Sequence, residues 1–125
     1  MDKENILIID DDKLVCTALK KELEGVGYTA DYAMDAEEAL SKVSEKKYDI
    51  IFVDFVLPRT DGIEVCRKIK EIRPDSIVVF ITGKVDKNTI QDEVRFMEEG
   101  GESKCLYKPF FENEIAETVK KILHR

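Results

Sequence analysis

Short apolar runs alternate with longer segments of helical period along the whole chain, and this alternation constrains the fold more than any other feature. The runs are expected to be strands at residues 3–10, 28–32, 49–54, 76–82 and 104–107. Between and after them, apolar residues recur at spacings of three and four, which is typical of one face of a helix. Strict alternation of strands and helices predicts a parallel sheet with helices on both faces. Right-handed crossovers then bring the carboxyl ends of all strands to one edge of the sheet, where ligands bind.

Local signals place the ends of several elements. Asp12 and Asp35 each precede a segment of helical period, so each is expected to cap the helix that follows. The segment 55–62, punctuated by Pro58 and Gly62, is expected to be a loop. The apolar residues expected on the buried faces of the last two helices are Ile90, Val94 and Met97, and then Phe111, Ile115, Val119, Ile122 and Leu123.

Composition limits the partners. The chain has 125 residues, the length of one domain, and a formal net charge of −7 from 20 Lys and Arg against 27 Asp and Glu. This excess of acid argues against direct binding to nucleic acid or to an anionic membrane surface. No apolar run is long enough to span a bilayer and no signal sequence is visible, so a cytoplasmic protein is expected. Three separated cysteines and a single histidine argue against a disulfide framework and a zinc site.

Polar residues follow the expected strands at the edge where a ligand would bind. Asp10 and Asp11 end the first strand, Asp54 ends the third, Thr82 ends the fourth and Lys108 follows the fifth. If the first and third strands are neighbours, about 4.8 Å apart, the carboxylates share one pocket. Carboxylates this close repel one another unless a cation compensates, and a site of carboxylates and water suits Mg²⁺. With a lysine and a hydroxyl added, such a site has the groups that phosphoryl transfer needs, and a carboxylate can itself be the nucleophile.

Four motifs carry a resemblance to a known family. They are ILIIDD at residues 6–11, DIIFVDFVLPRTDG at 49–62, VVFITG at 78–83 and LYKPF at 106–110. Each motif alone is weak, but the four in this order and at these spacings are highly specific. The sequence resembles the response-regulator receiver domain of two-component signalling over essentially its whole length, residues 1–125. The resemblance implies a flavodoxin-like, doubly wound (βα)5 fold of the α/β class, with a five-stranded parallel sheet of order 2-1-3-4-5 and helices on both faces.

The resemblance also implies roles for the acidic residues. Asp54 would be the phosphoacceptor. Asp11 and Asp54 would bind Mg²⁺ through their carboxylates, with the backbone carbonyl of Val56 as a third ligand. Asp10 would hold metal-bound water or orient the site.

Lys108 and Thr82 complete the implied site. Lys108 would contact the phosphoryl oxygens, with its stem directed by a cis bond to Pro109, and Thr82 would donate its hydroxyl to the phosphoryl group and move on activation. The donor would be a sensor histidine kinase or a histidine phosphotransfer protein. The domain would catalyse its own phosphorylation and dephosphorylation rather than act as an enzyme on a separate substrate. Movement of Thr82 would bias the face formed by the fourth helix, fifth strand and fifth helix toward an effector that the sequence does not name.

One switch position departs from the family pattern. The family usually has Tyr or Phe three residues before the lysine, as a ring that swings inward when the threonine moves, and this chain has Cys105 there. Tyr107 lies two residues later, on the same face of the strand by alternation, and would replace that ring only with a different geometry. The sequence therefore does not determine how phosphorylation is coupled to output. The phosphorylation chemistry itself does not depend on the residue at position 105.

Two other classes of function compete with the receiver. A receiver-like interaction module would signal without phosphorylation, and Cys105 leaves room for it although the acidic site is intact. A phosphatase resembling the haloacid dehalogenases would use Asp10 as nucleophile with Asp12, but the chain has no second acidic pair late in the sequence and no room for a cap domain. Loss of function in Asp54→Asn would separate the receiver from both. The sequence does not decide among a stand-alone receiver, a relay shuttle and a piece of a larger regulator.

Overall fold

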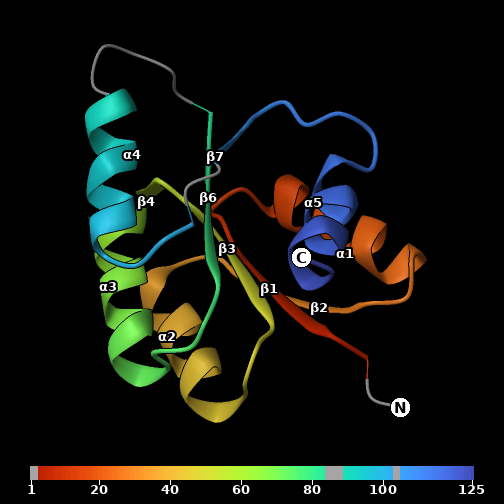
Figure 1. Ribbon diagram of the computed structural model, residues 1–125, viewed down its shortest axis with the longest axis horizontal. Helices are drawn as coiled ribbons and strands as arrows, with labels where there is room; N and C mark the ends of the chain where they lie inside the picture. The colour runs from red at the N-terminus through yellow and green to blue at the C-terminus, as the bar shows by residue number, and fades with distance from the viewer. Residues whose placement is uncertain (1–2, 84–88, 103–104) are drawn as a thin grey trace.

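A parallel sheet lies between two layers of helices in the computed structural model, which describes residues 3–83, 89–102 and 105–125 (Figure 1). The strands of this sheet are β1 (Asn5–Ile9), β2 (Thr29–Ala33), β3 (Ile50–Asp54), β6 (Val78–Thr82) and β7 (Cys105–Tyr107). Their order is β2-β1-β3-β6-β7, and all neighbours pair in parallel. Since β6 and β7 are the fourth and fifth strands of this sheet, the predicted order 2-1-3-4-5 is confirmed. The first strand residue expected in β7, Lys104, lies outside the described residues.

Helices cover both faces of the sheet, as the alternation predicted. One face carries α1 (Lys13–Gly25) and α5 (Glu114–Leu123), and the other carries α2 (Ala36–Glu45), α3 (Gly62–Ile72) and α4 (Thr89–Glu98) (Figure 1). Every residue of the central strand β3 is buried, because both of its faces are covered. The apolar side chains accordingly form two cores, one on each side of the sheet.

Short polar side chains begin the helices where the sequence indicated. The carboxylate of Asp12 accepts a hydrogen bond of 2.9 Å from the backbone of Leu14, and Asp35 accepts one of 2.8 Å from Glu38. Both predicted caps are therefore confirmed. Asp61, which was not singled out, caps α3 in the same way by accepting 2.9 Å from the Glu64 backbone.

The segment expected to be a loop contains a small hairpin instead. β4 (Val56–Leu57) and β5 (Thr60–Asp61) pair antiparallel directly after the sheet strand β3. The chain reverses through Arg59, which adopts a φ of 63°. The hairpin escaped prediction because two-residue strands show no usable alternation. It sets the distance between the end of β3 and the start of α3.

The buried face of α4 differs from the predicted one. Of the predicted residues of α4, Val94 and Met97 are 43% and 40% exposed, and the side chain of Ile90 lies outside the described residues. Phe96 is buried instead, with its ring centroid 4.7 Å from that of Phe80 on β6. The packing of Phe96 on Phe80, and not the spacing of the apolar residues, therefore determines which face of α4 is buried.

Phe111 was predicted to lie on the buried face of the last helix, but it is exposed and precedes α5. Ile115 and Val119, within α5, are buried as predicted. Among the described residues, no helix is long and apolar enough to cross a membrane.

Candidate functional site

The ends of two neighbouring strands bring the predicted acidic residues together. Asp10 directly follows β1, Asp54 is the last residue of β3, and Asp11 lies next to Asp10. One carboxylate oxygen from each of these three residues lies within 4.8 Å of the others. Asp10 and Asp54 are buried while Asp11 is exposed, so the cluster opens to solvent on the Asp11 side. The sequence-based grouping of the carboxylates is therefore found in the structure.

Lys108 bridges the two buried carboxylates. Its Nζ lies 2.6 Å from Asp10 Oδ2 and 3.3 Å from Asp54 Oδ2. The backbone N–H of Lys108 donates a 2.9 Å hydrogen bond to the carbonyl of Thr82, which ties the lysine to the end of β6. The Lys108–Pro109 peptide bond is cis, as the resemblance implied.

Backbone and thiol contacts fix the orientation of Asp10. Its Oδ1 accepts a 2.9 Å hydrogen bond from the backbone N–H of Asp12, and its own backbone carbonyl accepts one of 3.2 Å from Cys16 Sγ. The Asp10 Oδ2 atom faces Lys108. The carboxylate is held on one side by the turn into α1 and on the other by the ammonium.

The site carries more negative charge than it can neutralise alone. Burial raises the pKa of Asp54 to about 6, and the charge of Asp10 adds to this, while Lys108 acts in the opposite direction. Burial would lower the pKa of Lys108, but pairing with Asp10 and Asp54 raises it. One ammonium therefore faces three carboxylates. This imbalance of oxygen ligands and charge fits a hard divalent cation such as Mg²⁺.

The remaining predicted residues border this cluster. Thr82 is buried at the end of β6. Val56 begins β4 two residues after Asp54, is partly exposed, and its backbone hydrogen bond lowers the pKa of Asp54. Thr82 is thus the last residue of β6, and Val56 is the first residue of the hairpin that follows β3.

Gly62 is a site residue that the sequence reasoning treated only as a break. A Cβ at this position would lie 2.5 Å from the backbone oxygen of Asp54 and 3.2 Å from the Cα of Phe55. The N–H of Gly62 donates a 2.8 Å hydrogen bond to the Phe55 carbonyl, which closes the hairpin against the end of β3. Only a residue without a side chain permits this approach. The glycine directly after a capping aspartate was the available signal.

Cys105 and Tyr107 lie on the face of the sheet that α4 covers. Cys105 pairs in register with Phe80 and packs on the core that contains Phe96, and Tyr107 lies on the same face of the strand, as predicted from alternation. The Tyr107 hydroxyl donates a hydrogen bond to Glu93 of α4, a residue that the sequence gave no reason to single out. Burial, and then the charge of Glu93, raises the pKa of the Cys105 thiol to about 12, so this thiol is protonated and poorly nucleophilic.

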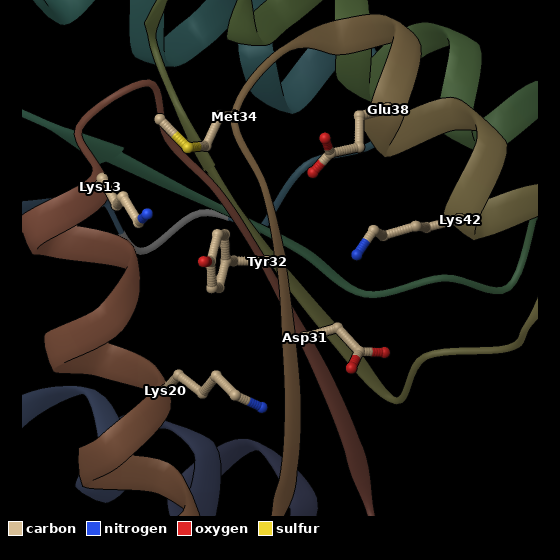
Figure 2. Close-up of a pocket in the computed structure, with 7 residues that line it drawn as sticks. All are labelled: Lys13, Lys20, Asp31, Tyr32, Met34, Glu38 and Lys42. Carbon is tan, nitrogen blue, oxygen red and sulfur yellow. The ribbon is translucent and has the colours of Figure 1, made fainter.

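Among the hollows outside the acidic cluster, two border α1. A pocket of about 660 Å³ lies between α1, β2 and α2. Lys13 and Lys20 of α1 lie on the same side of β2 as Tyr32, whereas Asp31 points to the side of α2 (Figure 2). Lys20 donates a 2.5 Å hydrogen bond to the carbonyl of Ala30, an outward group of the edge strand. A second hollow of about 540 Å³ runs from Lys108 along α1 and is lined mainly by apolar side chains. It is the one that adjoins the predicted site.

Comparisons with known proteins agree with this geometry. The chain matches the family model of the response regulator receiver domain over residues 6–120. It is 35% identical over 128 residues to the transcriptional regulatory protein ResD of Bacillus subtilis (strain 168), an alignment that covers 100% of this chain and 51% of ResD. The chain spans about half the length of the curated relatives it matches.

Solved structures show the same fold. A two-component response regulator from Clostridium difficile is 35% identical, with a TM-score of 0.89 over 98% of both chains. The response regulator TrrA from Thermotoga maritima, solved in complex with Mg²⁺-BeF, is 28% identical with a TM-score of 0.80 over 95% of this chain and 98% of that chain.

Proposed function

The chain belongs to the response regulator receiver domain family of two-component systems, and on that premise we propose that Asp54 accepts a phosphoryl group from a phosphohistidine of a partner protein. The observation that carries the proposal is the cluster of Asp10, Asp11 and Asp54 around the single ammonium of Lys108 at the carboxyl edge of the sheet. An oxygen of Asp54 would form the new bond to phosphorus as the bond from phosphorus to the donor imidazole breaks. Water would later attack phosphorus, releasing inorganic phosphate and restoring the Asp54 carboxylate.

The donor set fits a magnesium ion. Asp11 and Asp54 would bind it through their carboxylates and Val56 through its backbone carbonyl, with Asp10 holding a metal-bound water. When bound, Mg²⁺ would neutralise the charge that develops on the phosphoryl oxygens. That TrrA was solved with Mg²⁺-BeF supports this assignment by likeness.

Lys108 and Thr82 would act on the phosphoryl group from the other side. Lys108 already reaches Asp54, so its ammonium would meet a phosphoryl oxygen with a small movement while it stays paired with Asp10. Thr82 is buried at the end of the neighbouring strand, and its hydroxyl would donate to a second oxygen. A backbone hydrogen bond of 2.9 Å from the Lys108 N–H to the Thr82 carbonyl links these two residues.

The surface formed by α4, β7 and α5 would change on phosphorylation and contact the downstream effector. A sensor histidine kinase or a histidine phosphotransfer protein is the proposed donor, and the apolar hollow beside Lys108 offers such a partner a surface next to the phosphoacceptor. The added phosphoryl group brings about 1.5 to 2 negative charges at neutral pH to this edge of the sheet. We expect that charge to change the conformation of the α4–β7–α5 face. The chain would then act as a signalling domain rather than as an enzyme with a substrate of its own.

Intact-protein mass spectrometry tests the proposal. The protein is incubated with acetyl phosphate in the presence of Mg²⁺ or of EDTA, beside the variant Asp54→Asn. We expect a gain of one phosphoryl group in the wild type with Mg²⁺ only. A gain of the same size in Asp54→Asn, or no gain in either protein, would overturn it, and the second result would favour an interaction module that works without phosphorylation.

A further inference from the structure

We propose that the hydrogen bond between Tyr107 and Glu93 holds α4 against the sheet in the unphosphorylated protein and breaks when Asp54 is phosphorylated. The inference rests on the proposed function and names the residues that would carry its output. It concerns a contact of this chain's own side chains, at a position one strand repeat beyond Cys105.

Tyr107 is the direct lateral neighbour of Thr82. The two residues pair in register across β6 and β7, and parallel neighbours in register share one face of the sheet. The next residue, Lys108, donates its backbone N–H to the Thr82 carbonyl. A shift of Thr82 or Lys108 toward a phosphoryl group would therefore reach Tyr107 through this ladder bond and the adjoining peptide. No element lies between Tyr107 and the site.

Tyr107 also reaches α4 from the sheet. Its hydroxyl donates to the Glu93 carboxylate, although the ring itself is 38% exposed. Cys105, one repeat earlier on the same face, packs against the core that contains Phe96, and its thiol also interacts with the Glu93 carboxylate. Tyr107 therefore supplies the hydroxyl contact from this strand to Glu93, beside the thiol of Cys105.

Apart from its contacts with β7, α4 is attached through Phe96 and by its packing on α3. Of its residues with described side chains, Phe96 alone is buried, against Phe80. Val94 and Met97 are exposed apolar residues. Phe96 packs under Gly101 near the carboxyl end of the helix, whereas Glu93 lies one turn earlier. The Tyr107–Glu93 bond is thus the attachment nearer the site, and its loss would free that end of α4 to move about the Phe96 anchor.

Thermodynamic linkage makes the proposal measurable. If the bond exists only in the unphosphorylated state, removing it shifts the protein toward the phosphorylated conformation and strengthens the binding of a phosphoryl mimic by the same factor. A hydrogen bond to a charged, partly exposed group corresponds to about a 3- to 10-fold change. If the bond persists in both states, its removal changes nothing in that affinity.

The experiment titrates beryllium fluoride in the presence of Mg²⁺ into the 125-residue protein and follows binding by amide chemical shifts. The variants are Tyr107→Phe, Glu93→Ala and the double variant. Tyr32→Phe, on the opposite edge strand β2, and Glu98→Ala, at the end of α4, are the matched controls. We expect each single variant to bind 3- to 10-fold more tightly, the double variant to bind as tightly as either single one, and the controls to match the wild type.

The contrary outcomes are distinct. Unchanged or weaker affinity in Tyr107→Phe and Glu93→Ala, or fully additive gains in the double variant, would overturn the inference while leaving Asp54 as the acceptor. Absence of binding by the wild type, together with no phosphoryl gain from acetyl phosphate, would overturn the proposed function and the inference with it. Hydrogen exchange over residues 91–98 gives a second readout, because both variants should exchange faster than the wild type before any beryllium fluoride is added.

Discussion

Lys108 forms its shorter ion pair with Asp10 and not with Asp54. The ammonium lies 2.6 Å from Asp10 Oδ2 and 3.3 Å from Asp54 Oδ2, and Asp10 is fully buried. The lysine is thereby anchored to a residue that we do not expect to react. This arrangement places a cation beside Asp54 while leaving the proposed acceptor the more weakly held of the two carboxylates.

Replacing Lys108 should destabilise the fold, because Asp10 and Asp54 are buried carboxylates that share its charge. In Lys108→Met the stem volume is nearly kept, but Asp10 and Asp54 lose their shared cation. We expect the free energy of unfolding at pH 7 without Mg²⁺ to fall by about 3 kcal/mol, because a buried charge is left uncompensated. Urea denaturation gives this value. Lys21→Met on the exposed side of α1 is the control and should stay within about 0.5 kcal/mol of the wild type. Equal losses in the two variants would contradict the pairing.

Gly62 should tolerate no side chain. A Cβ there would meet the backbone of Asp54 at 2.5 Å, whereas a Cβ at Gly25 would meet nothing within 4 Å. We expect Gly62→Ala to lower the free energy of unfolding by about 1–3 kcal/mol and to slow phosphorylation by acetyl phosphate, because the end of β3 must shift. Gly25→Ala should be neutral or slightly stabilising. Thermal unfolding and the phosphorylation rate are the measurements, and a Gly62→Ala protein that matches Gly25→Ala in both would refute the close approach.

The raised pKa of Asp54 predicts a pH-dependent stability. Its folded-state value of about 6 exceeds the ordinary 3.8, so between these values the folded protein binds more protons than the unfolded chain. Stability should therefore fall as pH rises through this window, by about 2–3 kcal/mol in total without Mg²⁺. Asp54→Asn lacks the titrating group and should become more stable than the wild type above pH 6. Unfolding by urea from pH 4 to 8 measures the difference, and a difference that is constant with pH would contradict the assignment.

Glu22 should support α5 from a distance in sequence. The N-cap residue Asn113 makes no side-chain capping bond, and the carboxylate of Glu22 on α1 accepts a 2.8 Å hydrogen bond from the Ala116 backbone. We expect Glu22→Ala to lower the free energy of unfolding by about 1 kcal/mol, since a helix amide loses its acceptor and the helix dipole its anion. Lys21→Ala on the same helix is the control. The fluorescence-detected melting temperature suffices, and no difference between the two variants would disprove the cap.

The sequence predicted what depends on chain topology and left out what depends on packing. Asp10, Asp54 and Lys108 meet because alternating strands and helices force their strand ends to one edge, and this needs no knowledge of side-chain contacts. Phe96 was missed because Val94 and Met97 satisfy the helical period, while only the position of Phe80 decides which face is buried.

The contacts of Glu22 and Glu93 were missed for a related reason. The bond from Ala116 to Glu22 joins residues 94 apart, and that from Tyr107 to Glu93 joins residues 14 apart on different elements. Nothing in the local sequence distinguishes these two glutamates from the solvated acids around them. Such contacts follow from the relative placement of helices, which the period of a single helix does not contain.

The most direct measurement locates the phosphoryl group on the chain. The protein phosphorylated by acetyl phosphate with Mg²⁺ is reduced with borohydride, which converts an aspartyl phosphate to homoserine, and its peptides are sequenced by mass spectrometry. The account predicts homoserine at residue 54 and unchanged aspartate at residues 10, 11 and 12. Homoserine at residue 10 would contradict the account and favour the phosphatase-like use of Asp10, and homoserine at none of the four residues would contradict phosphorylation of this site.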